Sequence, residues 1–391
     1  MSKKICLHNG TILSGISTME KCAVLIDDGI IADVFSEERL SQKHIGSDVE
    51  IIDVDGAYIS PGFIDTHIHG FRGCGTDNPS ADAMLQMSES LAQFGVSAFN
   101  PTFYPSSEET MVRGIKEVLK AMGHEKGAKI MGIHLEGPFI SPDKLGVQRP
   151  ETVKKVDLAL MDRLWKASEG HIVNMTVAPE LKGMRDLALD CLKKGIVLQA
   201  GHTNAEYKHM TEGMQAGILH STHLFNAMSQ MHHRNPGAVG SVLIHPEISC
   251  EIIADGVHVH PDLIKLLVRD KPLDKIVLVT DALTPTEQTE GPLFANGEEV
   301  VFKGGCFHRK SDDVIAGSAL TMMQGVKNLV SYGLEPEQAV KCASANPARI
   351  MRYYHKGMII PDMDADVIVF DKNFKLLVSI IGGEIKKNVV D

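Results

Sequence analysis

Apolar and polar residues follow two different patterns along this chain. Before residue 60 the apolar runs are short and separated by turn signals. The run "AVLIDDGIIADV" has Asp28-Gly29 at its centre, which predicts a β-hairpin. The segment 355–391 has the same short runs, such as "DADVIVFD". We therefore expect residues 1–60 and 355–391 to form one small β-sandwich domain.

The middle of the chain, residues 61–354, alternates between strand-like and helical segments. One helical segment, 106–122, carries its apolar residues on one face, and Ser106 with Glu109 could form a capping box at its start. Eight strand–helix units predict an α/β fold, a (β/α)8 TIM-like barrel. The eight apolar runs span residues 63–69, 96–102, 129–136, 172–178, 196–202, 218–223, 250–256 and 275–281.

Composition is compatible with one large domain and one small one. Of the 391 residues, 43% are hydrophobic, and a formal net charge of −11 without a Lys/Arg run argues against a nucleic-acid partner. The absence of a signal-peptide pattern and of an 18-residue apolar run argues against a membrane partner. The seven cysteines have no regular spacing or C-x-x-C pair, which favours reduced thiols and a cytoplasmic location.

Several strand-like runs end in residues that can bind a metal. Catalytic groups of such barrels lie at the carboxyl ends of the strands. Each residue alone could be a packed or capping polar group, but their shared position predicts a site for a divalent metal. The candidates are His67 and His69 in "FIDTHIHG", Glu136 in "GIHLEGPF", His202 in "LQAGHT", His223 in "HSTHLFN" and Asp281 in "VLVTDAL".

The mixture of imidazole and carboxylate favours zinc or iron over magnesium. His67 and His69 lie on one strand face, so they can share an ion. We expect one or two ions per subunit. A bound metal lowers the pKa of its water to ~7 and polarises a carbonyl. Asp281 is then the natural general base and later proton donor, which predicts a hydrolase.

The loop "HLFNAMSQMHHRNPG" follows the sixth strand and is rich in groups that hold anions. Arg234 can bind phosphate oxygens in a fork, His233 can assist, and Asn226 and the N–H of Ala227 can donate. A solvated polar loop is the alternative. A sugar or phosphate ester is the expected occupant.

Two further segments lie at the same predicted rim. His258, after the seventh run, could hold a substrate hydroxyl or phosphate. The Gly-Ser turn in "VIAGSALTM" could line the site or cap a helix.

The motifs "PGFIDTHIHG" and "DADVIVFD" resemble the amidohydrolase superfamily. Within it, "HLEGPF", "AGHT", "THLFNAM", "HHRNPG", "ADGVHV" and "VTDA" resemble, in order over nearly the whole chain, the family of N-acetylglucosamine-6-phosphate deacetylases. The resemblance implies hydrolysis of the acetamide of N-acetylglucosamine 6-phosphate to glucosamine 6-phosphate and acetate, in amino-sugar catabolism.

The resemblance also implies roles for single residues. Glu136, His202 and His223 would hold the principal metal, and Asp281 would be the acid/base. In the family the arginine reaches the phosphate in a neighbouring subunit's site, which predicts a homodimer. Substrate contacts would come from Asn226, Ala227, Arg234, His258 and the backbone of Ile315, Ala316 and Gly317.

Two positions vary among relatives. Some lack the H-x-H pair and bind one metal, whereas this chain has His67 and His69, which predicts a second ion. Some carry a histidine that contacts the acetyl carbonyl where this chain has Gln148. We expect the second ion to polarise the carbonyl in place of that histidine.

Three alternatives stay open. The first is the same reaction on N-acetylgalactosamine 6-phosphate. The second is another reaction of this barrel, on a cyclic amide or by deamination, against which "LEGPF" and "HHR" argue. The third is a non-catalytic scaffold, which the filled candidate positions disfavour.

Overall fold

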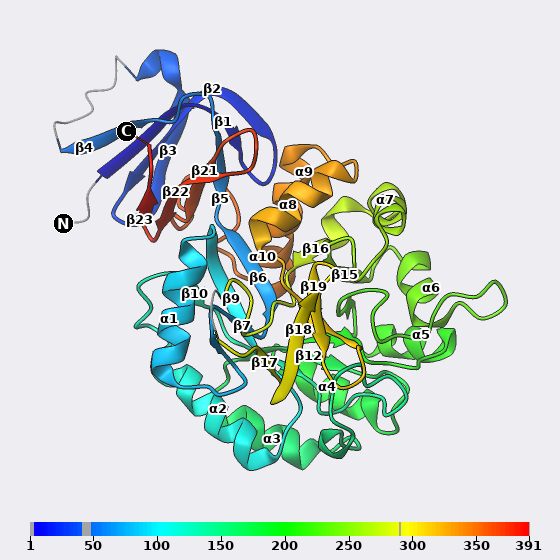
Figure 1. Cartoon of the computed structure of the whole chain (residues 1–391). Coiled ribbons are helices and arrows are strands. Elements are labelled where there is room, and N and C mark those ends of the chain that lie inside the picture. Colours follow the sequence, from blue (N-terminus) through cyan, green and yellow to red (C-terminus); the bar gives the residue numbers. More distant parts are fainter. Residues whose placement is uncertain (1–3, 41–47, 289–290, 391) are drawn as a thin grey trace.

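The computed structural model describes residues 4–40, 48–288 and 291–390. A barrel of parallel strands, surrounded by helices, carries a small β domain at its side (Figure 1). The predicted fold class, an α/β barrel with a small β domain formed by both ends of the chain, is confirmed.

From the first barrel strand to the last, each strand pairs in parallel with the next, and backbone hydrogen bonds at the carboxyl ends of the first and last strands close the ring. The Asp281 N–H donates to the His67 carbonyl and the His69 N–H to the Ala282 carbonyl, both at 2.9 Å. Three candidate site residues therefore lie at this closure. The strands are β6 (Phe63–Ile68), β9 (Val96–Phe103), β11 (Ile133–Glu136), β12 (Ile172–Val177), β13 (Val197–Ala200), β14 (His220–Ser221), β15 (Ser249–Ile253) and β16 (Ile276–Val279), with β10 (Lys129–Ile130) beside β9.

A helix follows each barrel strand, as the alternating pattern predicts. The predicted capping box is wrong by one residue: α2 starts after Ser107, whose hydroxyl accepts from the Thr110 N–H. Ser107 lies next to Ser106 and has the extended backbone that a cap requires, but Thr110 stands where a capping box needs Glu or Gln. The helices are α1 (Ala81–Ala92), α2 (Glu108–Ala121), α3 (Leu158–Ala167), α4 (Met184–Lys193), α5 (Tyr207–Gln215), α6 (Gly237–Ile244), α7 (Pro261–Asp270) and α8 (Met322–Ser331), followed by α9 (Pro336–Ala343) and α10 (Ala345–Met351).

Both ends of the chain contribute to one eight-stranded sheet. The predicted hairpin at Asp28-Gly29 is confirmed between its second and third strands. The first half of β1 pairs with β4 and its second half with β5, and apolar side chains from both ends fill one core. The strands are β1 (Lys4–Leu13), β2 (Thr18–Asp27), β3 (Ile30–Ser36), β4 (Val49–Asp53), β5 (Tyr58–Pro61), β21 (Val367–Phe370), β22 (Leu376–Ile381) and β23 (Glu384–Asn388).

The exact division of the chain into 1–60 with 355–391, and 61–354, stays a prediction. The sheet is compatible with it, because β5 ends at residue 61 and β21 begins at 367.

None of the described helices is long and apolar enough to cross a membrane.

A separate antiparallel sheet, formed by the chain segment between β16 and α8, was not predicted. It lies across the barrel (yellow in Figure 1) and ends in the segment 315–317 that sequence analysis places at the site. Its strands are β17 (Phe294–Ala295), β18 (Glu298–Lys303), β19 (Cys306–Arg309) and β20 (Ile315–Ser318). The remaining short elements are β7 (Gly70–Phe71), β8 (Cys74–Gly75) and the 3-10 helices η1 (Glu37–Arg39), η2 (Pro150–Thr152) and η3 (Leu273–Lys275).

Candidate active site

Three candidate residues stand in the same place relative to their strands. His202, His223 and Asp281 each follow the last residue of a barrel strand by two positions. All three have positive φ, of 46°, 23° and 51°, which is rare for residues with side chains. Strained backbone of this kind is concentrated at functional sites, where the surrounding structure holds it. The chain turns sharply there, and the three side chains meet at the mouth of the barrel.

Glu136 is the centre of the cluster. Its Oε1 lies 3.1 Å from Nε2 of both His202 and His223, and its Oε2 lies 3.5 Å from Nε2 of His69. Burial alone would raise the pKa of Glu136, but the facing imidazoles outweigh burial and hold that pKa well below its usual value. One oxygen of the carboxylate therefore faces His202 and His223, and the other faces His69.

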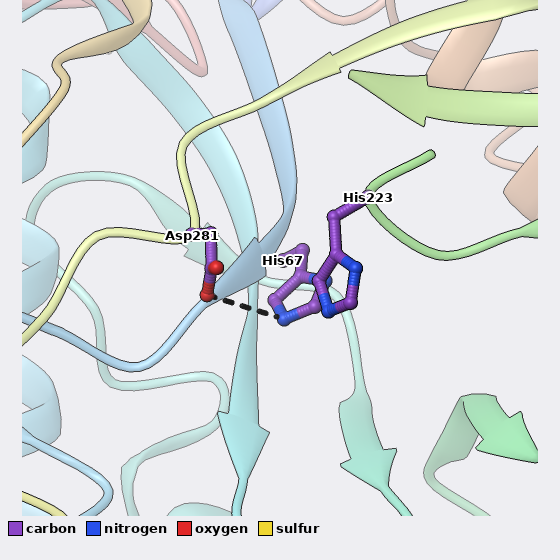
Figure 2. Close-up of side chains that lie close together, drawn as sticks. All are labelled: His67, His223 and Asp281. Atoms are coloured by element: carbon purple, nitrogen blue, oxygen red, sulfur yellow. Dashed lines mark ion pairs between the residues drawn. The ribbon is translucent and has the colours of Figure 1, made fainter. Parts of the chain in front are cut away.

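His67 lies beneath this carboxylate and is 0% exposed. Its Nε2 is 3.5 Å from Oε1 of Glu136 and 3.5 Å from Oδ1 of Asp281. Figure 2 shows His67 between Asp281 and His223, with one ring nitrogen directed toward the Asp281 carboxylate. Burial alone would raise the pKa of Asp281, but the neighbouring histidines outweigh it and lower that pKa. Asp281 is thus a carboxylate at neutral pH.

The arrangement fits a divalent metal. Among the described residues, three groups have their ligand atoms within 4.8 Å of one another: Glu136 with His202 and His223, His67 with His69 and Glu136, and His67 with His223 and Asp281. Nε2 of His67 is buried and makes no hydrogen bond within the described part of the chain. Imidazole nitrogens with carboxylate oxygens are the donors that zinc and iron accept. Glu136 is shared by two of the groups, so it can serve two ions.

Hydrogen bonds on the far ring nitrogens orient these imidazoles. Nδ1 of His69 donates to the Thr102 carbonyl at 2.9 Å, and Nδ1 of His202 to the Lys144 carbonyl at 3.0 Å. A carbonyl can only accept, so Nδ1 carries the proton and the lone pair of Nε2 points to the centre.

A cavity of about 130 Å³ opens above the cluster. Gln148 lies in its wall and donates from Nε2 to Oε2 of Glu136 at 2.6 Å, while its own Oε1 is buried without a partner among the described residues. Nδ1 of His258 is 2.6 Å from Oδ2 of Asp255, which fixes that ring. The predicted residues that line the cavity are His69, Glu136, Gln148, His202, His223, Asn226, Ala227, His258, Asp281, Ile315, Ala316 and Gly317.

Two predicted residues lie elsewhere. His233 and Arg234 are not among the residues that line the cavity, and residues 230–235 are all exposed. The loop before α6 stands out from the side of the barrel (Figure 1). Within one chain, this part of the loop does not complete the cavity.

Two residues of the site, Tyr104 and Glu251, were not predicted from the sequence. Tyr104 stacks on His69, with ring centroids 3.8 Å apart and planes 4° from parallel. It directly follows the second strand, so the rule that found the other residues also applies to it. Glu251 is buried inside β15, where Oε2 is 3.0 Å from Nδ1 of His67. A carboxylate within an apolar strand was the available signal, because burying one is costly unless it is paired.

The fold and the site define a (β/α)8-barrel hydrolase with a centre of histidines and carboxylates. The chain belongs to the amidohydrolase family, whose model matches residues 58–390. It is 30% identical to N-acetylglucosamine-6-phosphate deacetylase of Bacillus subtilis, covering 98% of each chain, and 30% identical to N-acetylgalactosamine-6-phosphate deacetylase of Escherichia coli O157:H7, covering 83% and 86%. The crystal structure of N-acetylglucosamine-6-phosphate deacetylase from Pasteurella multocida superposes with a TM-score of 0.92 at 28% identity, covering 98% of this chain and 100% of that one.

Proposed function

We propose that this protein is a metal-dependent deacetylase that converts N-acetylglucosamine 6-phosphate to glucosamine 6-phosphate and acetate. The observation that carries the proposal is the shared carboxylate of Glu136 beneath a polar cavity, facing His202 and His223 with one oxygen and His69 with the other. The full-length similarity to deacetylases of this name supports the choice of substrate.

In this proposal Glu136, His202 and His223 hold the principal ion, and His67 and His69 share Glu136 with a second. Zinc or iron suits these donors. When bound, such an ion lowers the pKa of water and polarises the acetyl carbonyl.

Asp281 is the proposed acid and base. Its lowered pKa keeps it ionised, so it can accept a proton from the attacking water. It can then return this proton to the nitrogen of the leaving amine, which breaks the amide bond. The hydrogen bond from its own N–H to the His67 carbonyl fixes its backbone within reach of the histidines.

The rest of the cavity wall binds the sugar. Gln148 lines the cavity beside Glu136 as a substrate contact, and a second ion would polarise the acetyl carbonyl in place of the histidine that some relatives carry there. Asn226, the N–H of Ala227 and His258 offer donors to hydroxyl and phosphate oxygens. The backbone of Ile315, Ala316 and Gly317 covers the sugar from the antiparallel sheet.

We further propose that Arg234, assisted by His233, binds the phosphate in the site of a neighbouring subunit, so the working form is a homodimer. Within one chain neither His233 nor Arg234 lines the cavity, so in this proposal a neighbouring subunit supplies these two phosphate donors. The exposed loop 230–235, with Met231 58% exposed, is available to supply them.

Replacing Arg234 with alanine should raise KM for N-acetylglucosamine 6-phosphate about 10–100-fold with little change in kcat. The reason is that a charge-assisted bond to a remote phosphate is worth roughly 1.5–3 kcal/mol and orients the sugar without touching the scissile bond. Steady-state kinetics on the phosphorylated and unphosphorylated sugars measure this. An unchanged KM would exclude Arg234 from the phosphate site.

Mixing two variants that are each impaired at low substrate concentration tests whether Arg234 acts in the neighbouring subunit. A heterodimer of Arg234→Ala and Asp281→Asn subunits has one site with both defects and one with none, if Arg234 acts in the neighbouring site. Refolding the two together should therefore restore part of the activity at low substrate concentration. If Arg234 acts in its own subunit, both sites stay defective and mixing restores nothing.

Acetate release by metal-quantified protein tests the substrate. We expect release from N-acetylglucosamine 6-phosphate, much slower release from the unphosphorylated sugar, and none after chelation of the metal. The relative from Escherichia coli O157:H7 makes N-acetylgalactosamine 6-phosphate the second candidate, so both epimers are compared. If neither is hydrolysed by metal-loaded protein, the substrate is another amide. We also propose a cytoplasmic location, which the irregular spacing of the seven cysteines supports.

A further inference from the structure

A carboxylate that the proposed reaction does not use is buried below the metal-ligand cluster. Glu251 lies in β15 and is 0% exposed. Its Oε2 is 3.0 Å from Nδ1 of His67 and accepts from the His223 N–H at 3.2 Å. Burial alone would raise the pKa of Glu251, but the neighbouring His67 outweighs it and lowers the pKa to about 2. One buried carboxylate thus contacts residues from both proposed ion sites.

Glu251 is the last member of a line of hydrogen bonds through the barrel interior. The Tyr353 hydroxyl donates to Oδ1 of Asn100, and Nδ2 of Asn100 donates to Oδ1 of Asn174. Nδ2 of Asn174 then donates to Oε1 of Gln199, and Nε2 of Gln199 donates to Oε1 of Glu251 at 2.7 Å. The five side chains are all buried.

The donor-to-acceptor direction of these hydrogen bonds determines which oxygen of Glu251 is available to His67. Each amide accepts from one neighbour and donates to the next, so Gln199 presents an N–H to Oε1 of Glu251. Oε2 is then left for Nδ1 of His67 and the His223 N–H. A carboxylate can only accept, so Nδ1 of His67 carries the proton and Nε2 turns toward Glu136 and Asp281.

His67 differs from the other oriented histidines in the kind of group that holds it. Backbone carbonyls hold Nδ1 of His69 and His202, whereas a side chain holds Nδ1 of His67. The orientation of His67 therefore depends on one residue that a substitution can remove. The principal ion's proposed imidazoles do not depend on Glu251 through their side chains.

We propose that Glu251 is the positioning residue that creates the second ion site, by orienting His67. This inference rests on the proposed assignment of His67 and His69 to a second ion. A variant of this chain in which His67 lacks the Glu251 carboxylate should still bind the principal ion. Its affinity for the second ion should fall. Partners of this kind typically change metal affinity about 10–100-fold.

The test is titration of metal-free full-length protein with Zn²⁺ by calorimetry, with metal analysis of the loaded samples. Wild type should bind two ions per chain. In Glu251→Leu the Kd of the second ion should rise about 10–100-fold while that of the first stays within a few-fold. In a His67→Ala background, adding Glu251→Leu should change neither value further. If Glu251→Leu binds both ions with wild-type Kd values, the proposal is overturned. An equal rise of both Kd values also overturns it.

Two variants separate positioning from a general loss of folding. Glu251→Gln keeps the shape of the side chain. Its amide oxygen can accept from Nδ1 of His67 only if every amide in the line turns over. The Kd of its second ion should therefore lie between those of wild type and Glu251→Leu. If Glu251→Leu does not fold, a wild-type second Kd in Glu251→Gln overturns the proposal. Asp366→Asn removes a distant buried carboxylate paired with Lys356 at 2.7 Å and should keep both ions.

The same titration distinguishes this inference from the proposed function. Wild type that binds two ions but releases no acetate refutes the deacetylase and leaves the role of Glu251 standing. Wild type that releases acetate with one ion, and cannot bind a second, refutes the role of Glu251 and leaves the deacetylase standing.

Discussion

Asp281→Asn is expected to lower kcat for acetate release about 10²–10⁴-fold, the usual contribution of a positioned acid or base. Asparagine has nearly the same shape but cannot take up a proton from water and deliver it to the amine. The principal ion should stay bound, because its three proposed ligands, Glu136, His202 and His223, form a group without Asp281.

The measurement pairs single-turnover acetate release with metal content per chain. A large loss of rate at full occupancy of the principal ion supports the acid/base assignment. Loss of that ion would make Asp281 a required ligand instead. A rate within a few-fold of wild type would show that the proton moves through another group.

Sequence reasoning identified the barrel because its strands are buried on both faces and read as continuous apolar runs. The same runs located the site, since a polar residue that closes an apolar strand is visible in the sequence. His202, His223 and Asp281 each follow their strands by two residues, so a small error in the strand boundaries did not matter.

The antiparallel sheet β17–β20 was not predicted from the sequence, for a reason that lies in its burial pattern. Its turns carry ordinary hairpin signals, Asn296-Gly297 between β17 and β18 and Gly304-Gly305 between β18 and β19. Its strands, however, have exposed apolar residues such as Phe294 and Phe302, so they lack a regular alternation of buried and exposed positions. The turn residues alone could have predicted it.

The contacts within the site depend on distances that no sequence pattern contains. A sequence can suggest that Glu251 needs a partner, but the partner, His67, is 184 positions away. Nor does the polarity of "HHRNPG" tell whether Arg234 faces its own cavity. The family resemblance implied the neighbouring subunit, and the exposed position of the loop is compatible with that expectation.

Glu136→Gln should have the larger effect of the two central substitutions, because Glu136 belongs to both proposed ion sites. The amide removes the charge that offsets the surrounding imidazoles and places an N–H₂ where ligand oxygens are needed. Affinity for both ions should fall by more than the about 10–100-fold typical of a supporting residue. Loss of metal stabilisation worth several kcal/mol then lowers kcat/KM on the order of 10³–10⁵-fold, at about 1.4 kcal/mol per tenfold.

Metal analysis, Zn²⁺ titration and acetate release on the same preparation measure these effects. Glu125→Gln is the matched control: it removes another buried glutamate, which accepts from the Ile130 N–H at 3.2 Å and lies outside the cluster, so both ions should remain. If Glu136→Gln loses one ion and keeps the other at wild-type affinity, the carboxylate serves a single site. The two histidine groups would then bind independently, and His67 and His69 would need Asp281 as their carboxylate.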